Sequence, residues 1–102
     1  MRTIELDASE WKTSDDFVNA LKRAIGAPDW HGSSVNAFVD SMGTGGINAV
    51  EPPYMVRVVN ARRLGQDVVE LIAAISSAVE KRRLNEAARS GADVMVSLEI
   101  TN

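Results

Sequence analysis

The sequence predicts a single α/β domain over residues 1–102, with a three-stranded parallel sheet and helices packed against it. Three observations predict this class. The chain has 102 residues, which is enough for one hydrophobic core and too few for two. Its apolar periodicities follow the order strand, helix, helix, strand, long helical region, strand. Both connections between strands are long enough for helical crossovers, which join parallel strands along a right-handed path.

The first quarter of the chain predicts a strand followed by an amphipathic helix. Residues 3–6 alternate polar and apolar side chains, as a half-buried strand does. Residues 15–25 carry apolar side chains at helical spacing, and two residue types suited to a helix N-cap precede them. Gly26 is suited to the position after the helix, and Pro28 prevents continuation.

A second helix is predicted to follow, capped by Ser33 or Ser34. Its candidate buried stripe consists of Val35, Phe38, Val39 and Met42. Asn36 and Asp40 are four residues apart, so they share the other face of this helix. The glycine-rich residues 43–46 are expected to end the helix and to begin a flexible loop.

The second half of the chain predicts a strand, a long helical region and a final strand. Tyr54–Val59 is nearly all apolar, which is typical of a strand covered on both faces. Gln66–Ser90 has helical character throughout, but its apolar stripe changes phase between Val79 and Leu84. One bent helix, about 38 Å long, and two helices in series both remain open. Residues 93–100 alternate and predict the last strand.

Charge and composition exclude several classes of function. The chain carries 14 acidic and 11 basic residues and has no cysteine, so disulfides and thiolate metal sites are excluded. A net charge of −3 disfavours direct nucleic-acid binding, which requires a concentrated basic face. No apolar stretch approaches the roughly 20 residues that span a bilayer, and residues 1–5 lack the apolar run of a signal peptide. We therefore expect a soluble, cytoplasmic protein with no membrane partner.

The residues that could carry catalysis are few. His31 is the single histidine, and no second group is visible that could complete an acid and base pair with it. Residues 43–46 lack the lysine and the spacing of a phosphate-binding loop. We find no serine, histidine and acid set and no cluster of metal ligands. The sequence therefore predicts that the chain is not an enzyme and that it holds no cofactor and no metal.

The most informative motif is a turn rich in aromatic residues that leads into the second predicted helix. Residues 27–32 read APDWHG and residues 36–40 read NAFVD, which places Trp30 and Asp40 on one short helical unit. This segment, together with residues 86–94, resembles the barstar family, the small intracellular inhibitors of extracellular ribonucleases. The order of strands and helices is that of the barstar fold, so the resemblance covers most of the chain.

The resemblance implies a set of partner-binding residues. In the family, the second helix and the loop before it plug the active site of a nuclease. By position, Trp30 would lie against the catalytic groups of the partner and Asp40 would stand where a substrate phosphate binds. Glu86 matches a further interface acid. Asn36 replaces an acid of the family and Val39 replaces a tryptophan, which indicates a partner other than barnase itself.

Each candidate also has an ordinary structural interpretation. Trp30 can fill a hydrophobic cluster against the first helix, and Asp40 can be a solvated acid of a helix surface. Glu86 can pair with Arg82 or Arg83 in its own helix. These alternatives stay open at the level of the sequence.

The resemblance implies a protein inhibitor, monomeric when free, that acts as an immunity-type protein in the cytoplasm. It would bind a basic ribonuclease or a related toxin and block the active site by steric occlusion and by carboxylates that mimic substrate phosphate. The alternative is a barstar-fold interaction, immunity or regulatory module with a partner that is not a nuclease.

Overall fold

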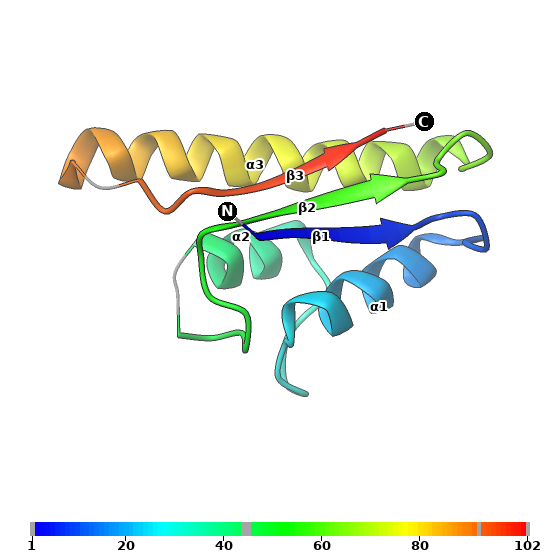
Figure 1. Cartoon of the computed structure of the whole chain (residues 1–102), viewed down its shortest axis with the longest axis horizontal. Helices are drawn as coiled ribbons and strands as arrows, with labels where there is room; N and C mark the ends of the chain where they lie inside the picture. The colour runs from blue at the N-terminus through cyan, green and yellow to red at the C-terminus, as the bar shows by residue number, and fades with distance from the viewer. Residues whose placement is uncertain (1, 44–45, 92, 102) are drawn as a thin grey trace.

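A computed structural model describes residues 2–43, 46–91 and 93–101. Within these residues the chain follows the predicted order of elements (Figure 1). The elements are β1 (Arg2–Asp7), α1 (Ser14–Ile25), α2 (Val35–Gly43), β2 (Tyr54–Val59), α3 (Gln66–Ser90) and β3 (Val96–Ile100). The predicted α/β class with its three-stranded parallel sheet is confirmed.

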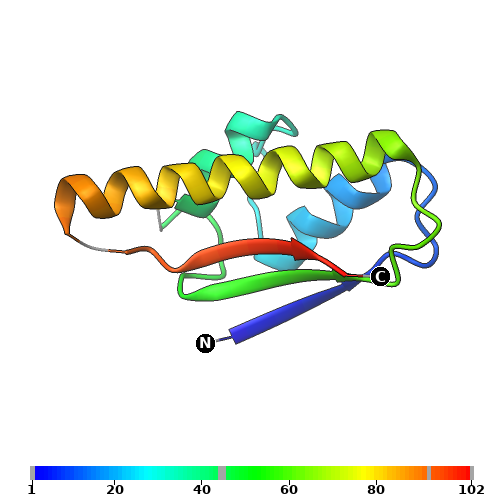
Figure 2. The same ribbon diagram turned by 90° about the horizontal axis from the view of Figure 1, so that it is seen from above.

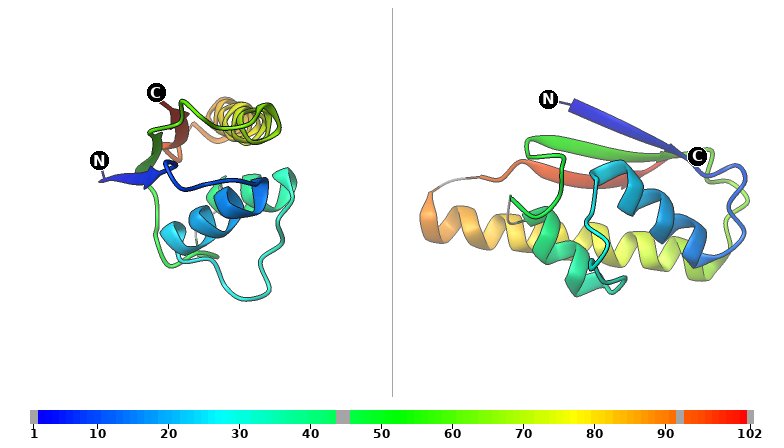
Figure 3. Two further views of the ribbon diagram at one scale, coloured as in Figure 1. Left: turned by 90° about the vertical axis from the view of Figure 1, so that its right-hand side faces the viewer. Right: turned by 90° about the horizontal axis from the view of Figure 1, so that it is seen from below.

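The three strands lie side by side in the order β1-β2-β3, and both pairs are parallel. The register pairs Ile4 with Val56 and Val56 with Leu98, so apolar side chains from all three strands meet on one face. The three helices cover this same face (Figures 2 and 3). This arrangement follows from right-handed crossovers between neighbouring strands in sequential order.

None of the helices formed by the described residues lies over the opposite face of the sheet (Figure 3), so the prediction that β2 is covered on both faces is wrong. Alternate residues of β2 are only half-buried. Arg57 on this face donates from Nε to Glu99 Oε1 at 2.6 Å, and this hydrogen bond raises the pKa of Arg57. The high apolar content of β2 therefore did not require a second layer of helices.

The hydrophobic core fills the space between the covered face of the sheet and the helices. The sheet contributes Tyr54 and the valines of β2 on the inner side, and α1 contributes Phe17, Leu21 and Ile25. The other fully buried side chains of the helices are Phe38 and Met42 in α2, and Val68, Ile72, Ile75 and Val79 in α3. Each helix thus presents one apolar face to the core, as its sequence period predicted.

The long helical region is one helix, α3, of 25 residues. Its first half packs on the core, but Leu84 is 60% exposed, so the apolar stripe after the phase change does not join the core. Figure 1 shows the reason, since α3 continues well beyond the ends of the strands. Arg83 ties this overhanging part to Asp93 by two hydrogen bonds of 2.6 and 2.9 Å, which lower the pKa of Asp93.

The last strand is shorter than predicted, because residues 93–95 form its approach and pairing begins only at Val96. Met95 has a positive φ of 55° just before the strand, which interrupts the extended conformation. In the predicted glycine loop, Gly43 belongs to α2, and residues 44 and 45 lie outside the described residues.

The start of α1 is held by Asp16, whose Oδ2 accepts the backbone N–H groups of Lys12 at 2.7 Å and Thr13 at 3.0 Å. These bonds satisfy backbone donors that precede the helix. At the other end, Gly26 has a φ of 67°, and a Cβ there would lie 2.5 Å from that of Ala49. Helix α1 therefore ends where only glycine fits against residues 46–50.

The hydrogen bonds to Asp16 make the stability of the fold depend on pH. They lower the pKa of Asp16 below 3.8, and the bond from the Lys12 amide contributes most. A carboxyl with a lowered folded-state pKa contributes stability above its unfolded pKa and loses it as the pH falls through the folded pKa. We expect the free energy of unfolding to fall below about pH 4, and Asp16→Asn to make this fall shallower. Urea unfolding at several pH values tests this, and identical slopes in both proteins would contradict it.

Candidate protein-binding site

Trp30 lies in the loop between α1 and α2, and its side chain is 74% exposed. The turn that presents it is closed by a hydrogen bond of 2.9 Å from the His31 amide to the Pro28 carbonyl. The interpretation of Trp30 as a core residue is therefore wrong. An exposed tryptophan is the side chain most typical of the centre of a protein interface.

His31, the next residue, is buried and fastens the loop to α2. Its Nδ1 donates to the Gly32 carbonyl at 2.5 Å, because the carbonyl can only accept, and its Nε2 shares a hydrogen bond of 2.7 Å with Ser41 Oγ. The ring also packs on Phe38 with 4.9 Å between centroids. The loop and α2 are thereby joined next to Trp30.

Sequence reasoning considered His31 only as a catalytic candidate and missed this role. A signal was present, since a lone histidine follows the turn tryptophan directly. It precedes a helix in which Ser41 lies between residues predicted to be buried. A histidine near such a helix can satisfy its ring nitrogens only with local polar partners.

Helix α2 separates a buried face from an exposed one. Ser34 is its cap, since its Oγ accepts the Ala37 amide at 3.1 Å. Phe38 and Met42 are fully buried, while Val35 and Val39 are half-buried at the edge of the core. Of the predicted partner-binding residues of this helix, Asn36 and Asp40 are exposed and Val39 is only half-buried.

Asp40 and Glu86 come from different helices but contact the same guanidinium. Arg82 Nη1 lies 3.2 Å from Asp40 Oδ1, and Arg82 Nε lies 3.6 Å from Glu86 Oε1. Arg89 Nη2 also donates to Glu86 Oε1 at 2.5 Å. The ordinary interpretation of Glu86, pairing with Arg82 in its own helix, is therefore correct. The structure nevertheless brings this acid close to Asp40.

Trp30 and Asp40 line a common hollow of about 250 Å³. Its remaining walls are formed by His31, Gly32, Ala37, Ser41 and Ile47. This hollow lies between the loop, α2 and the segment that follows α2, so it joins the aromatic and the acidic candidate in one surface. Of the other predicted residues, Asn36, Val39 and Glu86 are not among its walls. Asp40 keeps 71% of its side chain exposed there and remains available to a partner.

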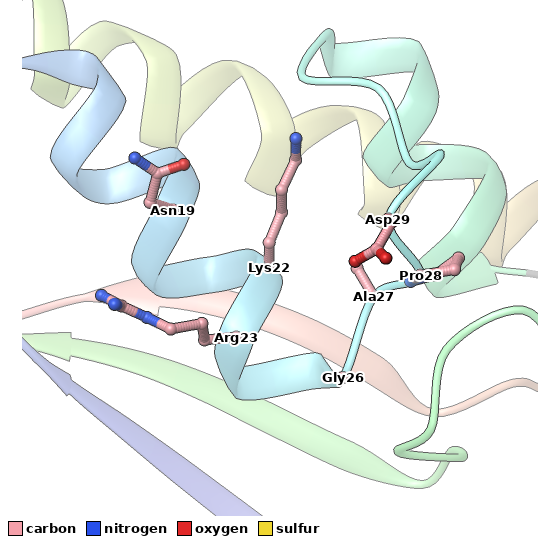
Figure 4. Close-up of a pocket in the computed structure, with 7 residues that line it drawn as sticks. All are labelled: Asn19, Lys22, Arg23, Gly26, Ala27, Pro28 and Asp29. Atoms are coloured by element: carbon pink, nitrogen blue, oxygen red, sulfur yellow. The ribbon is translucent and has the colours of Figure 1, made fainter.

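A second hollow, of about 420 Å³, lies between the end of α1 and the start of the same loop (Figure 4). It is lined by Asn19, Lys22, Arg23, Gly26, Ala27, Pro28 and Asp29. Lys22 extends across it toward the loop, where its amine donates to Ser33 Oγ at 2.9 Å. It contains none of the predicted partner-binding residues, although it is the larger of the two.

Two further properties concern the described residues only. Among them, no group of three or more histidine, aspartate or glutamate side chains is arranged to hold a metal ion. None of the helices formed by these residues has the length and apolar character needed to cross a membrane.

The fold and the surface together define a class: a small α/β domain in which an exposed tryptophan and an acid line one hollow. More particularly, the family model for barstar (barnase inhibitor) matches residues 1–99, and the chain belongs to this family. The resemblance stated from the sequence is thus confirmed. No curated protein is similar enough to the chain to count as a match.

Membership of the family settles the general type of activity. Barstar proteins are inhibitors and not enzymes, so the prediction that the chain is not an enzyme is confirmed. The family implies a barnase-type ribonuclease as the protein partner.

Proposed function

We propose that the chain inhibits a barnase-type ribonuclease by covering its active site with one surface, which we call the loop–α2 surface. This surface comprises Trp30, Asn36, Val39, Asp40 and Glu86. The observation that carries the proposal is that the exposed Trp30 and the exposed Asp40 line the same hollow. The tryptophan offers apolar area that a partner can bury, and the hollow can receive a side chain of the nuclease.

The acid supplies the second part of the proposed mechanism. Asp40 holds a carboxylate on the exposed face of α2, where it can meet a cation that binds substrate phosphate. Steric occlusion and this charge mimicry together would exclude RNA from the nuclease. The proposed setting is the cytoplasm of the cell that makes the enzyme, where the inhibitor acts as a monomer and confers immunity.

Inhibition of RNA cleavage tests the proposal. Titrated into a barnase-type ribonuclease captured with it from the source organism, the purified chain is expected to abolish RNA hydrolysis at one equivalent, and Trp30→Ala is expected to raise the dissociation constant about tenfold or more. Leu84→Ala is the matched control, since Leu84 is also an exposed apolar residue but lies on the overhanging part of α3. Failure of the native chain to inhibit, or an equal loss in both variants, would contradict the proposal.

A second candidate function is a barstar-fold module with a partner that is not a nuclease. One observation favours it: the two acids of the surface are already paired with arginines of the same chain. Capture of partners from the source organism separates the two candidates. A captured protein that hydrolyses RNA, and is inhibited by the chain, supports the first; a captured protein without this activity supports the second.

A further inference from the structure

Arg82 occupies the junction between α2 and α3, with an acid from each helix beside it. Its stem lies on Gly43, because a Cβ added there would be 3.2 Å from Arg82 Cγ. The guanidinium is therefore held over the end of α2, and only 32% of the side chain is exposed, against 76% for Arg89. Arg82 is thus a positioned part of the surface.

The charges at this junction alternate in sign. Asp40 and Glu86 supply two negative charges, and Arg82 and Arg89 supply two positive ones, so the cluster has no net charge. The fields of opposite charges a few ångströms apart largely cancel at distances well beyond their separation, and salt screens what remains over about 8 Å at physiological ionic strength. A generic polycation therefore gains little by approaching, and only a partner in close contact senses the individual groups.

Close contact creates a requirement of its own. A cation of the partner that binds Asp40 takes part of the carboxylate away from Arg82, while the interface removes water from the guanidinium. A guanidinium that loses water needs compensation by hydrogen bonds and opposite charge. An acidic side chain of the partner, placed opposite Arg82, supplies both.

We propose that Arg82 is a specificity-determining residue that screens Asp40 and Glu86 from generic cations and selects a partner carrying a carboxylate beside its cation. The inference rests on the proposed function, because it concerns the same surface. It narrows the partner to a protein whose complementary patch alternates in charge. A uniformly basic patch would leave Arg82 facing like charge.

Two peptide probes of equal length test the selection without any nuclease. Tetra-arginine presents a uniform positive charge, and Arg-Glu-Arg-Glu presents alternating charge. Each is titrated into the isotopically labelled chain, and the amide shifts around Asp40 and Glu86 give the dissociation constants. We expect Arg82→Gln to bind tetra-arginine about threefold more tightly than the native chain and to lose its relative preference for the alternating peptide.

Lys81→Gln is the matched control, because Lys81 is the exposed neighbouring cation of α3 and its change alters the net charge equally. Within the described residues Lys81 forms no ion pair with this cluster. Arg82→Met, which keeps the apolar stem over Gly43, is a second variant should Arg82→Gln fold poorly. An unchanged ratio of the two dissociation constants in the Arg82 variants, or an equal change in Lys81→Gln, overturns the proposal.

The same proteins assayed against barnase separate the two levels of inference. A shifted peptide ratio without inhibition of RNA cleavage would leave the role of Arg82 standing and would refute the proposed function for that nuclease. Inhibition of RNA cleavage with an unshifted peptide ratio would support the proposed function and refute the role of Arg82.

Discussion

Replacing Asp40 with alanine is expected to weaken binding to the inhibited nuclease by about 2 to 5 kcal/mol, the range for removing one partner of a buried charge pair. This corresponds to a loss of affinity of about 30-fold to 4,000-fold. The effect is large because Asp40 is exposed when free and would be covered, opposite a cation, in the complex. Isothermal titration calorimetry against barnase, or against a captured cognate nuclease, measures it.

The same substitution is expected to leave the fold nearly as stable as before. The contact between Asp40 and Arg82 lies at the surface, where an ion pair contributes about 0 to 1 kcal/mol. Urea unfolding of the variant should therefore show a small change beside a large loss of affinity. Glu70→Ala is the control: it removes the same charge from α3, 12 positions before Arg82 and so about 18 Å along the helix. Unchanged affinity in Asp40→Ala would remove this residue from the site.

The positions of the helices and strands were largely predictable, because each has a local signature of period and caps. The sequence did not indicate how many faces of the sheet the helices cover or where the core beneath α3 ends. The apolar content of β2 is compatible with one or two covered faces. The sequential strand order β1-β2-β3, with both crossovers right-handed, places every helix on one side. The phase change after Val79 likewise marks the end of the core beneath α3, and not a break in the helix.

At the site, the sequence did not indicate which of two neighbouring rings, Trp30 or His31, is buried. Size and hydropathy favour burial of Trp30, yet His31 is the one inside, at 5% exposure. The smaller, polar ring is accepted there because Ser41 and the Gly32 carbonyl satisfy both of its nitrogens. Those partners come together only after the loop has folded onto α2.

The two contacts of Arg82 differ in whether the sequence could predict them. Its pairing with Glu86 spans four residues of one helix, so it was among the alternatives that the sequence offered. Its pairing with Asp40 joins residues 42 positions apart, on different helices, and no local pattern announces it. The sequence therefore could not predict that Arg82 neutralises Asp40, because this contact depends on how α2 and α3 pack against each other.

Phe38→Ala is expected to lower the free energy of unfolding by about 3 to 5 kcal/mol, the usual effect of truncating a phenylalanine in a packed core. Phe38 is fully buried on the core-facing side of α2, so the substitution leaves a cavity that the sheet and helices cannot fill. This is a large share of the 5 to 15 kcal/mol that stabilises a typical domain. Urea unfolding followed by circular dichroism measures it. The neighbouring Val39→Ala, at a half-buried position, should cost clearly less, and equal losses in both variants would contradict the assignment of faces.

The effect of Phe38→Ala on binding distinguishes a residue that supports the binding surface from one that contacts the partner. Phe38 carries the ring of His31, and His31 holds the loop that presents Trp30. Loss of Phe38 should therefore weaken inhibition even in the fraction of molecules that remain folded, as single-concentration assays corrected for that fraction would show.

Trp30→Ala should behave in the opposite manner, with a large loss of inhibition and a change in unfolding free energy below about 1 kcal/mol, because its side chain packs little in the free protein. If Trp30→Ala instead destabilised the fold as much as Phe38→Ala, the indole would be a structural residue, and the loop–α2 surface would lose its aromatic contact.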